Sequence, residues 1–128
     1  MDVYKTHGAF SWSELMTTDP AAAAQFYSAL FGWTVKDMGA GMQHYRMASV
    51  GDAGVGGIMG MPEGAPSGMT PQWGCYVTVN DVDATLARCA ELGGMTLVPP
   101  MDVPGVGRMA VLRDPQGAVL NIMAYADA

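Results

Sequence analysis

The sequence is poor in charge, and above all in positive charge. Six lysines and arginines stand against twelve acidic residues, so the formal net charge is −6. The six cations are spread from Lys5 to Arg113 without forming a cluster. Binding to nucleic acid depends on cations grouped along one surface, where they neutralise phosphates. The composition therefore argues against a nucleic-acid partner, and it disfavours an anionic membrane surface for the same reason.

Long apolar runs and an export signal are also missing. No stretch approaches the roughly 18 consecutive apolar residues of a membrane-spanning helix. The first residues, MDVYKTHGAFSW, lack the charged and then apolar segments of a secretory signal. We therefore expect a cytoplasmic protein that does not enter a membrane. Its two cysteines, Cys75 and Cys89, are then expected to be inert buried thiols rather than a disulfide or a redox site.

What remains is the composition of one globular domain. The chain has 128 residues, half of them apolar and 14% charged. A domain of this length buries about two-thirds of the surface that its unfolded chain exposes, which leaves room for a core. We expect residues 1–128 to form a single domain.

That domain contains an internal repeat. The segment TTDPAAAAQFYSALFGWTV (17–35) aligns with VNDVDATLARCAELGGMTL (79–97) at a constant offset of 62 residues. At the same offset RMASV (46–50) matches RMAVL (108–112). Such self-similarity predicts two modules, at about 8–61 and 73–126. The segment between them, MPEGAPSGMTPQ, is rich in Pro and Gly and is interpreted as a connection.

One helix is predicted in each module, behind an N-capping aspartate. Asp19 precedes a helix over about 20–31 that ends at Gly32, and its stripe of large apolar residues is predicted to be core. Asp81 precedes the second helix, which ends at Gly93-Gly94. The stripes are Phe26, Tyr27, Leu30 and Phe31 in the first helix and Val82, Leu86, Cys89 and Ala90 in the second.

Strand-like runs surround both helices. They lie at about 9–17, 33–37, 43–50 and 54–60 in the first module, and at about 73–79, 95–98, 107–113 and 117–125 in the second. A turn at Asp114-Pro115-Gln116-Gly117 joins the last two. Each module is thus predicted as β-α-β-β-β, which makes the fold class α+β. A single helix layer covers one face of a sheet and leaves the other open toward a cavity, a partner or water.

The alternation of side chains along a strand sorts residues between these two faces. On the last strand, Leu120, Ile122 and Ala124 suit packing against the helix, which turns Asn121, Met123 and Tyr125 to the open face. Trp12, Glu14 and Tyr76 join them when the repeat offset is applied to the first strand of each module.

The chain resembles the vicinal oxygen chelate superfamily, which includes glyoxalase I, bleomycin-resistance proteins and extradiol dioxygenases. The resemblance is carried by ELMTTDPAAAAQFYSALFGW, VNDVDATLARCAELGG and DPQGAVLNIM, and it covers nearly the whole chain. It implies paired βαβββ modules that curve into a cup around a small-molecule site, often completed by a second subunit. A homodimer is expected on this ground.

The resemblance also implies where a metal ion would be held. Metal-dependent members place one His, Gln or Glu on the first and the last strand of each module, and these positions fall on Trp12, Gly57, Gly74 and Asn121. None of these four is a competent ligand for a divalent metal. His7 and His44 lie away from these positions and are interpreted as solvated or structural. We therefore expect neither a metal ion nor another cofactor.

The residues at the predicted cup suit the binding of an aromatic or apolar molecule. Asn121 is predicted to orient the ligand by hydrogen bonds, although a buried amide that satisfies itself within the wall is an alternative. Glu14, with Trp12 and Met16 on the same apolar face, is a candidate general base; the alternative is a salt bridge to Arg46 or Arg108. The predicted ligand-binding set is Trp12, Gly57, Met59, Gly74, Tyr76, Asn121, Met123 and Tyr125.

Three functions follow from these observations. The favoured one is a metal-free protein that binds a small molecule. The second is an enzyme, either a metal-dependent glyoxalase-like lyase or extradiol-type dioxygenase, or a metal-free catalyst of proton transfer that uses Glu14. The third is a non-catalytic dimeric interaction module.

Overall fold

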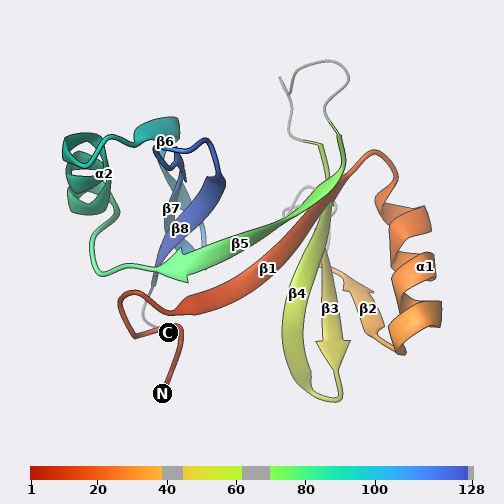
Figure 1. The fold of residues 1–128 in the computed structure, drawn as a ribbon. Coiled ribbons are helices and arrows are strands. Elements are labelled where there is room, and N and C mark those ends of the chain that lie inside the picture. The colour runs from red at the N-terminus through yellow and green to blue at the C-terminus, as the bar shows by residue number, and fades with distance from the viewer. Residues whose placement is uncertain (39–44, 62–69, 127–128) are drawn as a thin grey trace. The chain divides into compact units, whose positions relative to one another are not determined.

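The computed structural model describes residues 1–38, 45–61 and 70–126. Within them the order β-α-β-β-β occurs twice, as the repeat predicted (Figure 1). The elements are β1 Phe10–Thr17, α1 Pro20–Phe31, β2 Thr34–Asp37, β3 Arg46–Val50, β4 Ala53–Gly60, β5 Gln72–Thr78, α2 Val82–Glu91, β6 Met95–Val103, β7 Gly107–Arg113 and β8 Val119–Tyr125. The predicted α+β class is confirmed.

The chain forms two compact units. One consists of residues 13–74 and is called the first module. The other combines residues 1–12 with residues 75–128 and is called the second module. The beginning of β1 therefore belongs to the second module and its remainder to the first, and β5 is divided in the opposite sense.

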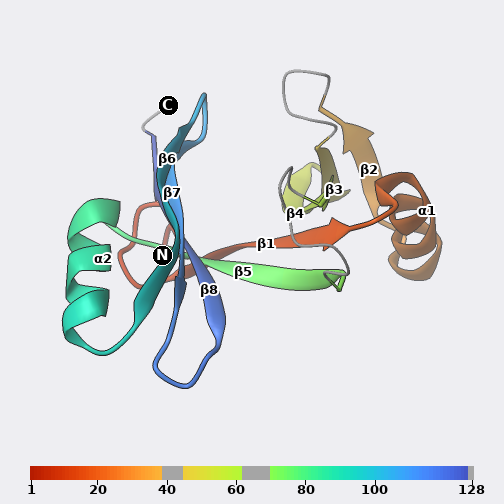
Figure 2. The same cartoon turned by 90° about the horizontal axis from the view of Figure 1, so that it is seen from above.

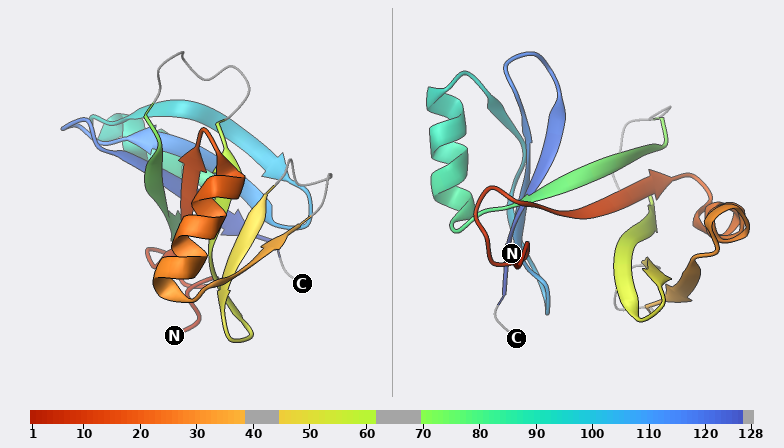
Figure 3. Two further views of the ribbon diagram at one scale, coloured as in Figure 1. Left: turned by 90° about the vertical axis from the view of Figure 1, so that its right-hand side faces the viewer. Right: turned by 60° about the horizontal axis from the view of Figure 1, so that its bottom comes forward.

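In the first module the strands follow the order β2-β3-β4-β1, with β4 parallel to β1 and the other pairs antiparallel. Helix α1 begins where the sequence predicted, because the Asp19 carboxylate accepts the backbone N–H of Ala22 at 3.0 Å. It ends at Gly32, whose φ of 76° lies in the left-handed region that glycine adopts without strain. The helix lies beside β2, β3 and β4 (Figure 3).

The predicted burial of the α1 stripe is wrong. Phe26, Leu30 and Phe31 are 59%, 57% and 59% exposed, and α1 has no fully buried residue. The half-buried residues of the helix include the small side chains of Ala23 and Ala24. The reason lies in β4, where Gly56 and Gly60 alternate with the buried Ile58 on the face opposite Gly57. Because glycines line this face of the sheet, the small side chains of Ala23 and Ala24 pack toward it, and the rings of Phe26 and Phe31 remain exposed.

In the second module the strands follow the order β5-β8-β7-β6, with β5 parallel to β8 and the remaining pairs antiparallel. Helix α2 lies against β6, β7 and β8 (Figure 2). The Asp81 carboxylate caps it by accepting the backbone N–H of Ala84 at 3.0 Å. The turn before β8 is also confirmed, since the backbone N–H of Gly117 donates to the Asp114 carbonyl at 3.0 Å.

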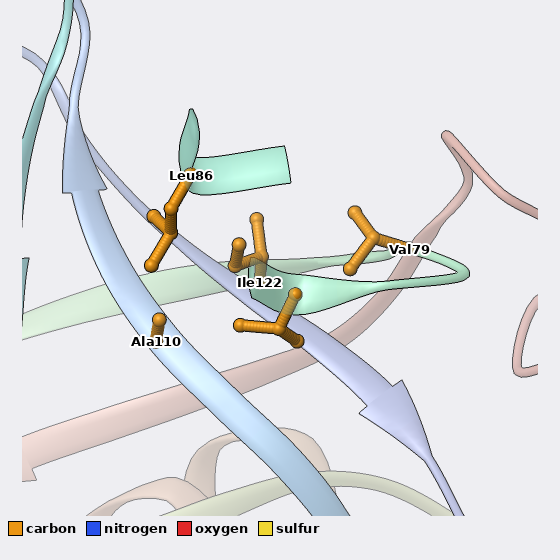
Figure 4. Close-up of a cluster of buried hydrophobic side chains, with 5 residues drawn as sticks. Val79, Leu86, Ala110 and Ile122 are labelled. Atoms are coloured by element: carbon orange, nitrogen blue, oxygen red, sulfur yellow. The ribbon is translucent and has the colours of Figure 1, made fainter. Parts of the chain in front are cut away.

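This module holds a buried apolar core between its helix and its sheet. Figure 4 shows Leu86 of α2 above Ala110 of β7 and Ile122 of β8, with Val79 beside them. The fifth member, Val82, is 1% exposed. Burial of an Ile or Leu side chain contributes about 1.5–3 kcal/mol, so this cluster fixes which face of β8 is turned to the helix. Of the predicted α2 stripe, Cys89 is only half-buried and Ala90 is exposed.

Two further predictions require correction. Cys75 is exposed rather than buried, although both cysteines are free thiols. Strand β6 continues to Val103, beyond the predicted end at residue 98, in spite of Pro99 and Pro100. Its pairing with β7 shifts register between Thr96 and Met101, and β6 is the last strand on its side of the sheet. Edge strands and bulges tolerate proline because no ladder hydrogen bond is lost there.

Candidate functional site

Four side chains of β5 and β8 lie together on the open face of the second module. Tyr76 on β5 is the register partner of Asn121 on β8, and Thr78 is the partner of Met123. These four residues are 2–6% exposed. Because Ile122 between them packs on α2, its neighbours point to the opposite face. Sequence alternation had predicted this orientation for Tyr76, Asn121 and Met123.

Strand β7 extends this surface on the other side of β8. Val111 is the register partner of Asn121, and Met109 is the partner of Met123. Both side chains are half-buried. An amide is thus set among a tyrosine ring, two methionines and a valine, which is the mixture of many apolar groups and few polar ones that small-molecule sites use.

The Asn121 amide has no hydrogen-bond partner within the described residues, since no protein hydrogen bond to its side chain is found there. Its polar atoms are also not sealed from solvent, because every fully buried side-chain nitrogen or oxygen in that part of the chain has a partner. The residue as a whole is nevertheless only 5% exposed. A nearly buried amide with reachable polar atoms can donate to and accept from a bound molecule.

The segment before β1 lies against one end of this open face. The Thr78 hydroxyl donates to the backbone carbonyl of Val3 at 2.6 Å. The rings of Tyr4 and Tyr125 meet edge to face at 5.1 Å. The hydroxyls of Ser11 and Tyr125 are 2.8 Å apart, and Trp12, which follows Ser11, is half-buried. Tyr125 is therefore held at both its ring and its hydroxyl, which fixes this border of the face.

The first module has an open face of its own, centred on Glu14. Glu14 on β1 is the register partner of Gly57 on β4, and Met16 is the partner of Met59. Glu14 is only 8% exposed, whereas Met59 and Gly74 are half-buried. A side chain added at Gly57 would overlap the Tyr45 phenol, so that ring occupies the space that the glycine leaves. The Tyr45 ring consequently reduces the free space beside Glu14 that Gly57, which has no side chain, would otherwise leave.

Two arginines, Arg46 and Arg108, were predicted as alternative ion-pair partners of Glu14. Arg46 is the register partner of Ile58, the residue on the opposite face from Gly57. Arg108 forms ion pairs with Asp83 at 2.8 Å and with Asp102 at 3.1 Å. The hydrogen bond from Arg108 holds the pKa of Asp83 below its ordinary value of 3.8. Arg108 therefore links α2 to β6 and β7.

The four positions that the resemblance assigns to metal ligands do not offer a divalent ion suitable donors. Trp12 has no free lone pair on its indole nitrogen, Gly57 and Gly74 have no side chain, and the amide of Asn121 is a weak ligand by itself. Elsewhere in the described ranges, no three His, Cys, Asp or Glu residues lie close enough to hold a metal ion. The residues present do not fit the metal site that the resemblance implies.

Of the two histidines, His7 lies among the described residues and makes a structural contact. The Nδ1 atom of His7 accepts the backbone N–H of Asn80 at 3.0 Å. The pair ties the segment before β1 to the entry of α2, which is a structural role. His44 lies outside the described residues.

Each module also has a groove beside its helix, which the sequence did not reveal. The volumes are about 400 Å³ in the first module and about 590 Å³ in the second. The two grooves use positions that correspond at the repeat offset: Asp19 and Asp81, Ala22 and Ala84, Ala23 and Thr85, Phe26 and Arg88, and Tyr27 and Cys89. The place of the groove is the same in both modules, but Phe26 and Tyr27 in the first correspond to Arg88 and Cys89 in the second. The repeat alignment would have paired these residues, but it contains no sign of a groove.

Comparison with known proteins identifies the family. Residues 9–122 match the model of the Glyoxalase/Bleomycin resistance protein/Dioxygenase superfamily. The chain is 40% identical over 117 residues to CFP32 of Mycobacterium tuberculosis, which is named provisionally as a glyoxylase. It is 39% identical over 127 residues to the anthracycline biosynthesis protein DauV of Streptomyces sp. strain C5. Each match covers 90% of this chain but only 45% and 46% of the relative, so the chain spans about half their length.

Solved structures agree on the fold. Methylmalonyl-CoA epimerase of Mycobacterium tuberculosis superposes with a TM-score of 0.63 at 17% identity, over 94% of this chain and 89% of the epimerase. Homoprotocatechuate 2,3-dioxygenase of B. fuscum gives a TM-score of 0.63 at 19% identity, over 92% of this chain and 32% of the dioxygenase. No described helix is both long and apolar enough to cross a bilayer. The repeated βαβββ modules and the match over residues 9–122 together place the chain in the glyoxalase/bleomycin resistance protein/dioxygenase superfamily.

Proposed function

We propose that the chain binds a small aromatic or apolar molecule on the open sheet face of the second module, without a metal ion, and that Asn121 orients it. The observation that carries the proposal is the Asn121 amide, nearly buried beside Tyr76 yet without a hydrogen-bond partner in the described residues. Because the polar atoms of this amide are reachable from solvent, a ligand with a hydroxyl or carbonyl group can replace water there and form hydrogen bonds with the amide.

The neighbours of Asn121 define the ligand further. Tyr76, Met109, Val111 and Met123 surround the amide with apolar and polarisable surface. Methionine adapts to ligands of irregular shape and makes favourable contacts with aromatic rings. One relative is named for anthracycline biosynthesis, and anthracyclines are fused aromatic ring systems. We therefore propose a planar aromatic ligand that carries an oxygen substituent.

The test is a binding titration with oxygenated and unsubstituted aromatic probes. 1-Naphthol and a hydroxyanthraquinone are titrated by calorimetry into the wild-type chain and into Asn121→Leu. The wild type should bind the oxygenated probes, and the variant should bind them about tenfold more weakly, the value of one hydrogen bond. Naphthalene should not distinguish the two proteins. Equal binding of 1-naphthol by both would overturn the proposed role of Asn121, and no binding to either would overturn the proposal.

A second candidate is metal-free catalysis of proton transfer by Glu14. What favours it is a carboxylate that is 8% exposed beside Met16, Met47 and Met59 on one sheet face. A general base needs such a position within reach of its substrate. Exchange of a carbon-bound proton with deuterated solvent, followed by NMR on acidic α-carbonyl probes, tests this candidate. Catalysed exchange that is lost in Glu14→Gln supports it, and exchange at the uncatalysed rate in the wild type rejects it.

We also propose that the chain forms a homodimer. The family resemblance motivates this proposal, and a chain with 50% hydrophobic and 14% charged residues is compatible with it. Sedimentation velocity between about 1 and 100 µM measures the dissociation constant directly. A single monomeric species over this range would refute the homodimer.

A further inference from the structure

The groove beside α1 in the first module lies outside the proposed ligand site. Its volume of about 400 Å³ falls within the range of about 300–1,000 Å³ that small-molecule sites occupy. Leu15 and Thr17 of β1 line it, and alternation puts both on the face of the strand opposite Glu14. The groove therefore shares no residue with the open face of its own module, and Asn121 belongs to the other module.

Thr17 brings to this groove a polar group that the described protein does not use. The residue is 8% exposed, and no hydrogen bond to its hydroxyl is found within the described residues. The hydroxyl is not sealed from solvent either, because every fully buried side-chain nitrogen or oxygen there has a partner. At the repeat offset Thr17 corresponds to Val79, a member of the apolar core of the second module. The first module thus carries a nearly buried hydroxyl, open to the groove, where its repeat carries a methyl group.

The charge of the groove is negative. Asp19 lines it, and its Oδ1 atom accepts the backbone N–H of Ala22 at 3.0 Å, whereas no hydrogen bond to its Oδ2 atom is found in the described ranges. Among the described residues, no lysine, arginine or histidine lines the groove. The chain as a whole carries a net charge of −6. Charge complementarity therefore favours a cationic ligand over an anionic one.

Three aromatic residues complete the lining: Phe26, Tyr27 and Trp73. Phe26 meets Tyr27 edge to face at 5.0 Å, and Trp73 meets it edge to face at 5.3 Å. The indole N–H of Trp73 also donates to the Tyr27 hydroxyl at 3.1 Å. Rings that are already held in place can pack against an aromatic ligand, and they attract cations as well.

The groove of the second module lacks this combination. Its capping aspartate, Asp81, corresponds to Asp19, but Arg88 stands in place of Phe26 and Cys89 in place of Tyr27. An arginine adds a positive charge, and the aromatic rings are gone from these positions. The two grooves thus share an aspartate and differ in the groups that would receive an aromatic cation, so the second groove serves as a control for the first.

We propose that the groove of the first module binds a small aromatic amine in its protonated form, a ligand class different from the one proposed at Asn121. The ammonium group donates hydrogen bonds to Asp19 Oδ2 and to the hydroxyl oxygen of Thr17, and the ring of the amine packs against Phe26 and Trp73. An ammonium group has three donors, which suits two acceptors and a water molecule.

The test is a calorimetric titration with tryptamine and with indole-3-propionate, which has the same ring and an anionic chain. The wild type should bind tryptamine and should bind indole-3-propionate at least about tenfold more weakly. Asp19→Asn should weaken the binding of tryptamine about tenfold, since asparagine keeps the N-cap and removes the charge. Thr17→Val introduces the residue of the second module and should weaken it about threefold. Asp81→Asn makes the same change beside α2 and should leave the affinity within about twofold.

The outcomes are separate from those for Asn121. Equal affinity of the wild type for the two probes, or no binding of tryptamine, would overturn the amine site and leave the proposed site at Asn121 standing. An affinity that neither Asp19→Asn nor Thr17→Val lowers would also overturn it. If these variants fail to fold, wild-type protein labelled with ¹⁵N at tryptophan decides instead. The indole signal of Trp73 should move and saturate with tryptamine while that of Trp12 stays fixed, and a Trp73 signal that does not move rejects the site.

Discussion

The two modules share one chain topology but use their helices differently. In the second module α2 buries Val82 and Leu86 in a core with Ala110 and Ile122, and turns charged residues outward. In the first module α1 meets a glycine-rich strand through small side chains and leaves its largest rings exposed. The comparison teaches that a repeat can preserve every strand and helix while the apolar surface of the helix faces the sheet in one module and the solvent in the other.

The open faces of the modules differ as well. Asn121 is surrounded by apolar side chains and has no hydrogen-bond partner in the described residues. Around Glu14, the Tyr45 phenol occupies the space over Gly57. Under the proposed function, the face around Asn121 receives a polar atom from the ligand, whereas the space over Gly57 is filled by the Tyr45 phenol.

The largest expected effect concerns the two helix–sheet layers. Leu86→Ala should lower the free energy of unfolding by about 2–4 kcal/mol, because it opens a cavity in a packed core. Leu30→Ala removes the same atoms from an exposed position and should cost less than about 1 kcal/mol. Urea unfolding at a concentration where the chain is monomeric measures both. Equal losses would mean that Leu30 is part of a core.

A second prediction compares glycines at corresponding positions. A methyl group at Gly94 would lie 2.5 Å from Cys89 Sγ and 2.9 Å from the Arg113 carbonyl oxygen, whereas at Gly32 it would meet no atom within 4 Å. Gly94→Ala should cost about 2–3 kcal/mol through overpacking, and Gly32→Ala about 1 kcal/mol because of its positive φ. Chemical denaturation compares the two. Adding Cys89→Ala should restore part of the stability of Gly94→Ala and none of that of Gly32→Ala.

The third prediction contrasts the open faces. Tyr76→Phe keeps the ring beside Asn121, so it should change the affinity for 1-naphthol by less than about threefold. Tyr76→Ala should weaken that affinity about tenfold, since the ring that supports the ligand is lost. Calorimetry on both variants, with Glu14→Gln as the control in the first module, separates the faces. A larger loss in Glu14→Gln than in Tyr76→Ala would move the site to the first module.

The smallest effect concerns the charged surface of α2. The Arg108 hydrogen bond lowers the pKa of Asp83 in the folded state. The Arg108–Asp83 ion pair therefore stabilises the folded state at pH values above 3.8, the ordinary pKa of this carboxyl. The contribution is lost as the pH falls through the lowered value. NMR titration should show the Asp83 carboxyl protonating below its ordinary range in the wild type and within it in Arg108→Gln. An unchanged titration in the variant would remove Arg108 as the cause.

Much of the fold follows from local signals in the sequence. Asp19 with Pro20 and Gly32 specifies both ends of α1, and the hydrogen bond from Ala22 to Asp19 shows the physical basis. Alternation placed Ile122 toward the helix and Asn121 away from it, which the core of the second module bears out. These features depend on residues close together in the chain, so periodicity and capping rules capture them.

The errors lie where packing between elements decides. Helical spacing identifies the stripe of Phe26, Leu30 and Phe31, but it does not tell which stripe meets the sheet, because that depends on the glycines of β4. In the same way, alternation places Gly57 on the open face and cannot reveal that Tyr45 fills the space above it. Both facts join residues from different elements, which a single sequence does not encode locally.

Asn121 allows the most direct measurement of the proposed site. The chain contains two asparagines, Asn121 on the open face and Asn80 before α2. Protein labelled with ¹⁵N only at asparagine gives two side-chain amide signals, so the second serves as an internal reference. On titration with 1-naphthol, the Asn121 side-chain signals should move and saturate while those of Asn80 stay fixed. Binding by calorimetry with no movement of the Asn121 signals would contradict the account.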